Sequence, residues 1–238
     1  MREMSKLTTV GFMAPPDFPE DAYNKVHSCL NKYKDTHRVQ WELFSLGWNG
    51  LAYRYRALAE YDEQFTTSVN VSISPPPEEL YKQGKAFFGF FVNAISVIEV
   101  FFFSTYCMAS ILKPCIFPLA KSDDLEFYPK KVALKFRAEF SQDPLSTEME
   151  RCLEHSTYWT INNIRKVLTH RGMPPRKFYV GGERNGLATM PTNLPAPSDQ
   201  WQFDLPVDAQ TTASLRQWLC DTLRDLVDAA NDFCNRKL

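Results

Sequence analysis

The stretch that decides the fold is Ala86–Leu112, which reads AFFGFFVNAISVIEVFFFSTYCMASIL. An apolar run of this length is long enough to cross a bilayer as a helix. Asn93 and Glu99 lie in its middle, however, and both side chains would be costly in lipid. We therefore predict a central helix that is buried on most sides by neighbouring helices, with a single membrane span as the alternative.

A strong helix start lies upstream of this run. Ser74 can cap free backbone amides, and the prolines that follow it suit a first helical turn. Glu78 and Glu79 oppose the positive end of the helix dipole. The central helix is therefore predicted to begin near residue 74 and to run to about residue 112, before Pro114.

Five further helices are predicted around the central one. In the second of them, apolar residues at steps of three and four mark one buried face. This stripe consists of Phe44, Trp48, Leu51, Tyr55, Leu58 and Phe65. The predicted spans are 19–34, 36–66, 128–141, 143–172 and 212–233.

The predicted helix 143–172 carries the candidate chemistry of this chain. Asp143 followed by proline gives it a start signal, which Thr147 and Glu150 reinforce at capping-box spacing. Gly172 and the prolines after it end the helix. Its predicted buried stripe contains Met149, Cys152, Leu153, Ser156, Trp159, Thr160, Ile164, Val167 and Leu168.

Residues 173–210 interrupt the helical pattern. Short β-prone pieces at 177–180 and 201–205 flank turn signals at Gly181-Gly182 and Asn185-Gly186, so this segment predicts an irregular excursion or a small β-hairpin. The predicted fold is all-α, an up-and-down helical bundle in one domain over residues 1–238. Residues 1–18 are expected to be loose, residues 19–66 to add N-terminal helices, and residues 74–235 to form the core bundle.

Composition and cysteine usage place the chain among cytoplasmic globular proteins. The formal net charge of the 238 residues is −1, which argues against indiscriminate binding to nucleic acid or to an anionic membrane. The N-terminus lacks the apolar core of a signal peptide. The six cysteines are scattered without a Cys-x-x-Cys pair, as expected for free thiols in a reducing cytoplasm.

A local basic segment surrounds one histidine, His170. Between Arg165 and Arg184 the chain holds six basic residues and a single acidic one, Glu183. Such a segment can capture phosphates although the whole chain is close to neutral. The alternative is a solvated helix end whose cations suit the negative end of the dipole. The candidate nucleic-acid-binding residues are Asn163, Lys166, Arg171, Arg176 and Lys177.

Arg165 and His170 are the candidate catalytic pair. Arg-x4-His is uninformative as a bare pattern, and Arg151 and His155 form a similar pair. Helical spacing places Arg165 well away from His170 around the axis. We expect them to converge either because the helix loosens near Thr169 or because a second copy supplies the partner group.

Glu99 is the third candidate of the site. It is the sole charge within the apolar helix, and a buried carboxylate requires a partner such as a guanidinium. The hypothesis is that Glu99 orients Arg165. The alternative is that Glu99 pairs with another cation or lies at an exposed edge.

The segment Asn163–Gly172, which reads NIRKVLTHRG, resembles the motif of HEPN (higher eukaryotes and prokaryotes nucleotide-binding) domains. These are all-α bundles with Arg-x4-6-His at a helix end, and the helix with Glu99 looks like their acidic core helix. The resemblance covers residues 76–235. It implies a dimer in which both motifs line one cleft. The position after the arginine is commonly asparagine, histidine or aspartate in this family, whereas here it is Lys166.

The resemblance implies a metal-independent endoribonuclease. His170 would act as general acid or base, and Arg165 would stabilise the charge that develops on the phosphate. The alternative is a non-catalytic module that binds RNA, a nucleotide or a protein such as an antitoxin. Neither a cofactor nor a metal is expected, since Cys152 and His155 have no second pair at zinc spacing.

Overall fold

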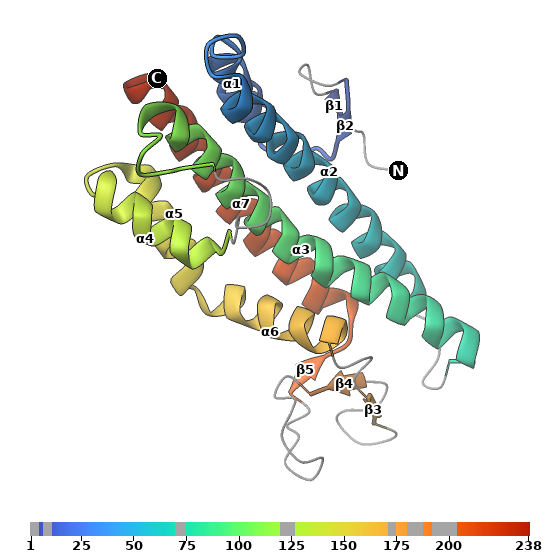
Figure 1. The fold of residues 1–238 in the computed structure, drawn as a ribbon. Coiled ribbons are helices and arrows are strands. Elements are labelled where there is room, and N and C mark those ends of the chain that lie inside the picture. Colours follow the sequence, from blue (N-terminus) through green and yellow to red (C-terminus); the bar gives the residue numbers. More distant parts are fainter. Residues whose placement is uncertain are drawn as a thin grey trace. The chain divides into compact units, whose positions relative to one another are not determined.

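A computed structural model of the chain describes residues 5–6, 11–69, 75–119, 127–170, 175–179, 188–191 and 204–238 (Figure 1). The described part is predominantly helical, which confirms the predicted all-α class. Its helices are α1 (Glu20–Asn31), α2 (Arg38–Val69), α3 (Pro77–Leu112), α4 (Pro129–Glu139), α5 (Pro144–Glu154), α6 (Ser156–His170) and α7 (Ala209–Lys237).

The strands are short and fall in two places. β1 (Ser5–Lys6) pairs antiparallel with β2 (Met13–Ala14), within the stretch that was expected to be loose. β3 (Lys177–Phe178), β4 (Ala188–Met190) and β5 (Leu205–Pro206) form an antiparallel sheet in the order β3-β4-β5. The predicted strand excursion is therefore confirmed, while the turn signals at residues 181–186 lie outside the described residues.

The chain divides into two compact units. The first consists of residues 1–56, 96–155 and 220–238, and the second of residues 57–95 and 156–219. The helices α2, α3 and α7 each contribute one part to either unit. The prediction of a single domain stays a prediction.

An aromatic pair on α1 and α2 organises the first unit. Tyr23 donates through its hydroxyl to the carbonyl oxygen of Trp48 at 3.1 Å, and the indole nitrogen of Trp48 donates to the carbonyl oxygen of Tyr23 at 3.1 Å. Their rings stack with centroids 5.2 Å apart, and the Trp48 ring also meets that of Phe101 on α3. Both polar atoms are thus satisfied in an apolar core, where an unpaired group would be destabilising.

The N-terminus of α5 is anchored within the same unit. Asp143 caps the helix by accepting a hydrogen bond from the backbone nitrogen of Leu145 at 3.1 Å. Arg236 of α7 donates to both carboxylate oxygens of Asp143 at 3.1 Å. The predicted start of this helix is therefore confirmed, and its cap is also a tertiary contact.

In the second unit α2 packs against α3 at close range. The rings of Phe65 and Phe87 have centroids 5.2 Å apart. A Cβ atom on Gly89 would lie 2.6 Å from the ring of Tyr61, so only glycine fits at this position. Figure 1 shows α2 and α3 side by side.

A buried ion pair joins α2 to α7 in the second unit. Arg216 donates from Nη1 to Oδ2 of Asp62 at 3.3 Å, and both side chains are about nine-tenths buried, with 11% and 12% of their surface exposed. Removing one partner of such a pair leaves a buried charge without compensation. The pair therefore constrains how the two helices meet.

The central apolar helix occurs as predicted, as α3. Among the described helices it alone has the length and composition to cross a membrane, and 67% of its most apolar window is buried inside the protein. Asn93 is buried and donates to the carbonyl oxygen of Gly89 at 2.7 Å. Glu99, in contrast, is partly exposed.

The predicted single helix 143–172 is wrong in one respect, because the chain breaks it at His155. This residue has an extended backbone, with φ −67° and ψ 134°, and it ends α5 before α6 begins at Ser156. Ser156 and Trp159, which follow the break, are exposed, although the sequence predicted both in the buried stripe. Ile164, Val167 and Leu168 of the same stripe are buried as predicted.

We predict opposite effects for alanine at two glycines. Gly89→Ala should lower the free energy of unfolding by about 1–3 kcal/mol, because the new Cβ atom would overlap the Tyr61 ring. Gly50→Ala is the matched control, since its Cβ atom would lie 4.0 Å from Val100, and it should raise stability by up to about 1 kcal/mol. Urea denaturation measures both changes, and equal effects at the two positions would contradict the close packing at Gly89.

The buried ion pair predicts a non-additive double-mutant cycle. Arg216→Met should destabilise the protein by about 3–5 kcal/mol, because Asp62 would remain buried without its cation. Asp62→Leu combined with Arg216→Met should destabilise it less than Arg216→Met alone. The cycle is measured by urea denaturation, and additive single effects would show that the pair is not coupled.

Candidate functional site

The candidate site lies on α6, in the second unit. The buried face of this helix consists of Tyr158, Ile161, Ile164, Val167 and Leu168. These side chains recur at steps of three and four residues, so they fix the rotation of the helix about its axis. The remaining residues of α6 consequently lie along the flanks of the helix or face solvent.

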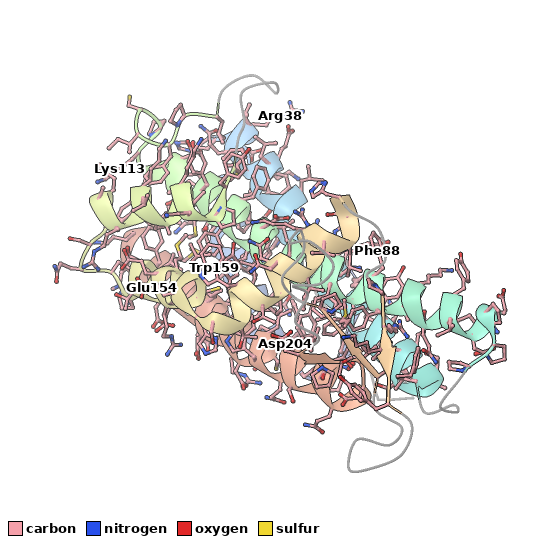
Figure 2. The ribbon with its side chains drawn as sticks, turned by 90° about the horizontal axis from the view of Figure 1, so that it is seen from below. Arg38, Phe88, Lys113, Glu154, Trp159 and Asp204 are labelled. Atoms are coloured by element: carbon pink, nitrogen blue, oxygen red, sulfur yellow. The ribbon has the colours of Figure 1, made fainter. Side chains whose placement is uncertain are left out.

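The solvent-exposed side of α6 presents a row of four side chains, Trp159, Asn163, Lys166 and His170, which we call the α6 outer face. Their steps of four, three and four residues place them along one helical face. Figure 2 labels Trp159 on this helix, and 46% of its surface is exposed. The outer face thus combines an indole, an amide, an ammonium group and an imidazole.

The structure does not place Arg165 on the outer face. Arg165 is partly exposed, and five residues of regular helix separate it from His170 by about 140° around the axis. The expected loosening near Thr169 is not observed, because α6 continues to His170 and the Thr169 hydroxyl donates to the Arg165 carbonyl oxygen at 2.8 Å. The helix therefore does not bring Arg165 and His170 together within one copy. A partner group from a second copy, the other predicted route, is compatible with this geometry.

The proposed pairing of Glu99 with Arg165 stays a prediction. Glu99 belongs to the first unit and Arg165 to the second. The sequence argument assumed that Glu99 is buried. In the structure this residue is partly exposed, so the assumption holds only in part.

The remaining basic candidates differ in their surroundings. Arg176 donates from Nη1 to Oε1 of Gln83 at 2.9 Å, and Gln83 in turn donates to the carbonyl oxygen of Ser68 at 2.9 Å. Burial lowers the pKa of Arg176, although an arginine stays charged at neutral pH. This network favours a structural role for Arg176. Lys177 on β3 is exposed, and Arg171 lies outside the described residues.

Sequence reasoning missed Trp159 as a candidate functional residue. Tryptophans at helical spacing are usually core, and the prediction followed that rule. The signal that could have identified it is its spacing to Asn163, Lys166 and His170, which are polar. A large apolar side chain that shares a face with three polar side chains is a candidate for ligand contact.

The described residues contain no group of three or more His, Cys, Asp or Glu side chains that could hold a metal ion. All six cysteines lie in the described part and are free, and four of them are buried. Burial raises the pKa of Cys152 to about 12, which keeps this thiol protonated and makes it a poor metal ligand beside His155.

A shallow groove of about 650 Å³ lies elsewhere in the second unit, between α2 and α3. Its charges are mixed, and Lys82 already forms an ion pair with Glu79 at 2.9 Å. Its lining includes none of the candidate catalytic or nucleic-acid-binding residues. The lining residues are Glu60, Glu63, Gln64, Thr67, Ser68, Glu79, Lys82 and Lys85.

Comparisons of this chain with known proteins place it in no established family. No protein-family model matches it, and neither the curated proteins nor the solved structures provide a match.

Proposed function

We propose that this protein binds RNA and cleaves it without a metal ion, in the manner of the HEPN domains that its motif resembles. His170 acts as the acid-base group, and Arg165 of a second copy stabilises the charge of the transition state. The observation that carries this proposal is the exposure of His170 beside Lys166 on one face of α6. A phosphodiester can approach this imidazole, which a buried ring would not allow.

The proposed reaction is attack of a ribose 2′-hydroxyl on the adjacent phosphate. A new bond forms between the 2′-oxygen and phosphorus, and the bond from phosphorus to the 5′-oxygen of the next nucleotide breaks. A base takes the proton of the 2′-hydroxyl, and an acid gives one to the leaving 5′-oxygen. Histidine can perform either role near neutral pH. The products are a 2′,3′-cyclic phosphate and a free 5′-hydroxyl.

The proposal requires a second copy because α6 separates Arg165 from His170 within one chain. A two-fold dimer that places Arg165 of one copy beside His170 of the other would form two such sites. The guanidinium then faces the equatorial phosphate oxygens, where negative charge increases during the reaction. Lys166 contributes a further positive charge for the substrate backbone.

The second candidate function is a non-catalytic module that binds RNA or a nucleotide. It is favoured by the unbroken helix between Arg165 and His170 and by the lysine at position 166. A cytoplasmic location fits both candidates, because both need RNA or nucleotides and the six free thiols suit a reducing compartment. A protein partner that covers the α6 outer face, such as an antitoxin, would inhibit either activity.

We predict that the protein cleaves single-stranded RNA in the presence of EDTA and that His170→Ala reduces the rate at least about 100-fold. His37→Ala is the matched control, because this partly exposed histidine lies directly before α2 and outside the outer face. It should cleave at the wild-type rate. Gel electrophoresis of a labelled RNA measures cleavage, and circular dichroism verifies the fold of each variant.

Undiminished cleavage by His170→Ala, or equal losses in His170→Ala and His37→Ala, would contradict the catalytic assignment. RNA binding by a wild-type protein that cleaves nothing would instead support the non-catalytic module.

Mixing two inactive variants tests the second-copy arrangement. If Arg165 and His170 come from different copies, then Arg165→Ala mixed with His170→Ala forms mixed dimers with one intact site. Random pairing should restore about a quarter of the wild-type rate. If one copy supplied both groups, the mixture would remain inactive. The measurement is cleavage of labelled RNA after the two variants have exchanged subunits.

A further inference from the structure

The exposed large side chain of α6 that the catalytic proposal does not use is the indole of Trp159. Its surface is 46% exposed, although burial of an aromatic ring is favourable. Tyr158, which is buried, contacts it edge-on, with ring centroids 5.4 Å apart and an interplanar angle of 77°. The neighbouring ring supports the indole from one side and leaves nearly half of its surface open.

We propose that the α6 outer face binds single-stranded RNA and that Trp159 stacks on one of its bases. This inference rests on the proposed function and specifies the class of RNA that the site takes. In this arrangement Asn163 offers hydrogen bonds to a base edge or a ribose, Lys166 contacts a phosphate, and His170 meets the scissile phosphate.

The spacing of these side chains suits a short run of nucleotides. With a rise of ~1.5 Å per residue, Lys166 lies about 10 Å and His170 about 16 Å along the axis from Trp159. At the ~3.4 Å repeat of stacked bases, the longer distance corresponds to about five nucleotides, and to fewer in an extended strand. The stacked base would therefore lie a few nucleotides away from the scissile phosphate.

Charge favours a nucleic acid over a protein as the occupant of this face. α6 carries Arg165 and Lys166 and has no Asp or Glu over its whole length, whereas the complete chain has a net charge of −1. The neighbours of Trp159 on the face are polar, so the indole does not belong to a contiguous apolar patch of the kind that protein interfaces require. An aromatic side chain in line with a lysine, Lys166, on a helix without acidic residues is a combination that single-stranded nucleic acids can use.

The same reasoning favours a single strand over a duplex. In double-stranded RNA the faces of the bases are already stacked on one another, and proteins contact mostly the backbone and the 2′-hydroxyls. An exposed indole adds affinity only if it can meet the face of an unstacked base. Trp159 should therefore contribute to the binding of single strands and not of duplexes.

The test measures the binding of a fluorescein-labelled 2′-O-methyl oligoribonucleotide, which lacks the attacking hydroxyl and stays intact. Trp159→Ala in the full chain should weaken its binding about 5- to 150-fold. Trp159→Phe, which keeps a π face, should retain most of the affinity, and Trp159→Leu, which keeps only apolar bulk, should not. Tyr81→Ala is the matched control, because Tyr81 is a 64% exposed aromatic residue on α3, and it should bind like the wild type.

The salt dependence of binding separates stacking from charge. Trp159→Ala should leave the slope of log affinity against log salt unchanged, whereas Lys166→Ala should reduce it by about 0.7 for a single strand. A duplex of the same sequence should bind equally well to the wild type and to Trp159→Ala. Unchanged affinity of Trp159→Ala for the single strand, or an equal loss for the duplex, would overturn the inference.

Failure of the stacking inference can be distinguished from failure of the proposed function. Cleavage that depends on His170 but not on Trp159 would overturn the stacking inference and leave the ribonuclease in place. Binding that depends on Trp159 without any cleavage would support the inference and favour the non-catalytic module. A wild-type protein that binds no single strand would overturn both.

Discussion

The burial of one face of α6 is the constraint on which the candidate site depends. Tyr158, Ile161, Ile164, Val167 and Leu168 fix the rotation of the helix, and this rotation leaves Trp159, Asn163, Lys166 and His170 in solvent. His155, which has an extended backbone, ends α5 before α6 begins at Ser156. The stripe predicted for one continuous helix included Trp159, whereas the buried face of α6 does not.

More of the fold than of the candidate site could be predicted from the sequence. Residues Ala86–Leu112 are too apolar for a surface loop, so α3 follows from local sequence. Asp143 followed by proline is a strong start signal, so the start of α5 also follows from local sequence. The break at His155 could not be predicted, because neither glycine nor proline marks it. It lies where the chain passes from one compact unit to the other, so packing outweighs the helical preference of this segment. The exposure of Trp159 was missed because a tryptophan at helical spacing is usually part of the core.

The rotation of α6 that exposes His170 also keeps Arg165 off the outer face. Regular helix cannot place residues five positions apart on the same face, and α6 stays regular to its end. A single copy therefore presents one candidate acid-base group on the outer face, and the proposed catalytic site needs the arginine of another copy. Oligomeric state therefore distinguishes the two proposed functions, a ribonuclease and a non-catalytic binding module.

Photo-crosslinking tests most directly that RNA lies on the α6 outer face. The full chain is bound to a single-stranded RNA that contains 4-thiouridine, irradiated and digested, and the crosslinked peptides are identified by mass spectrometry. The account predicts crosslinks within Ser156–His170, with Trp159 among the modified residues. Crosslinks confined to the other basic helix, α4, at Lys130, Lys131 or Lys135, would contradict it.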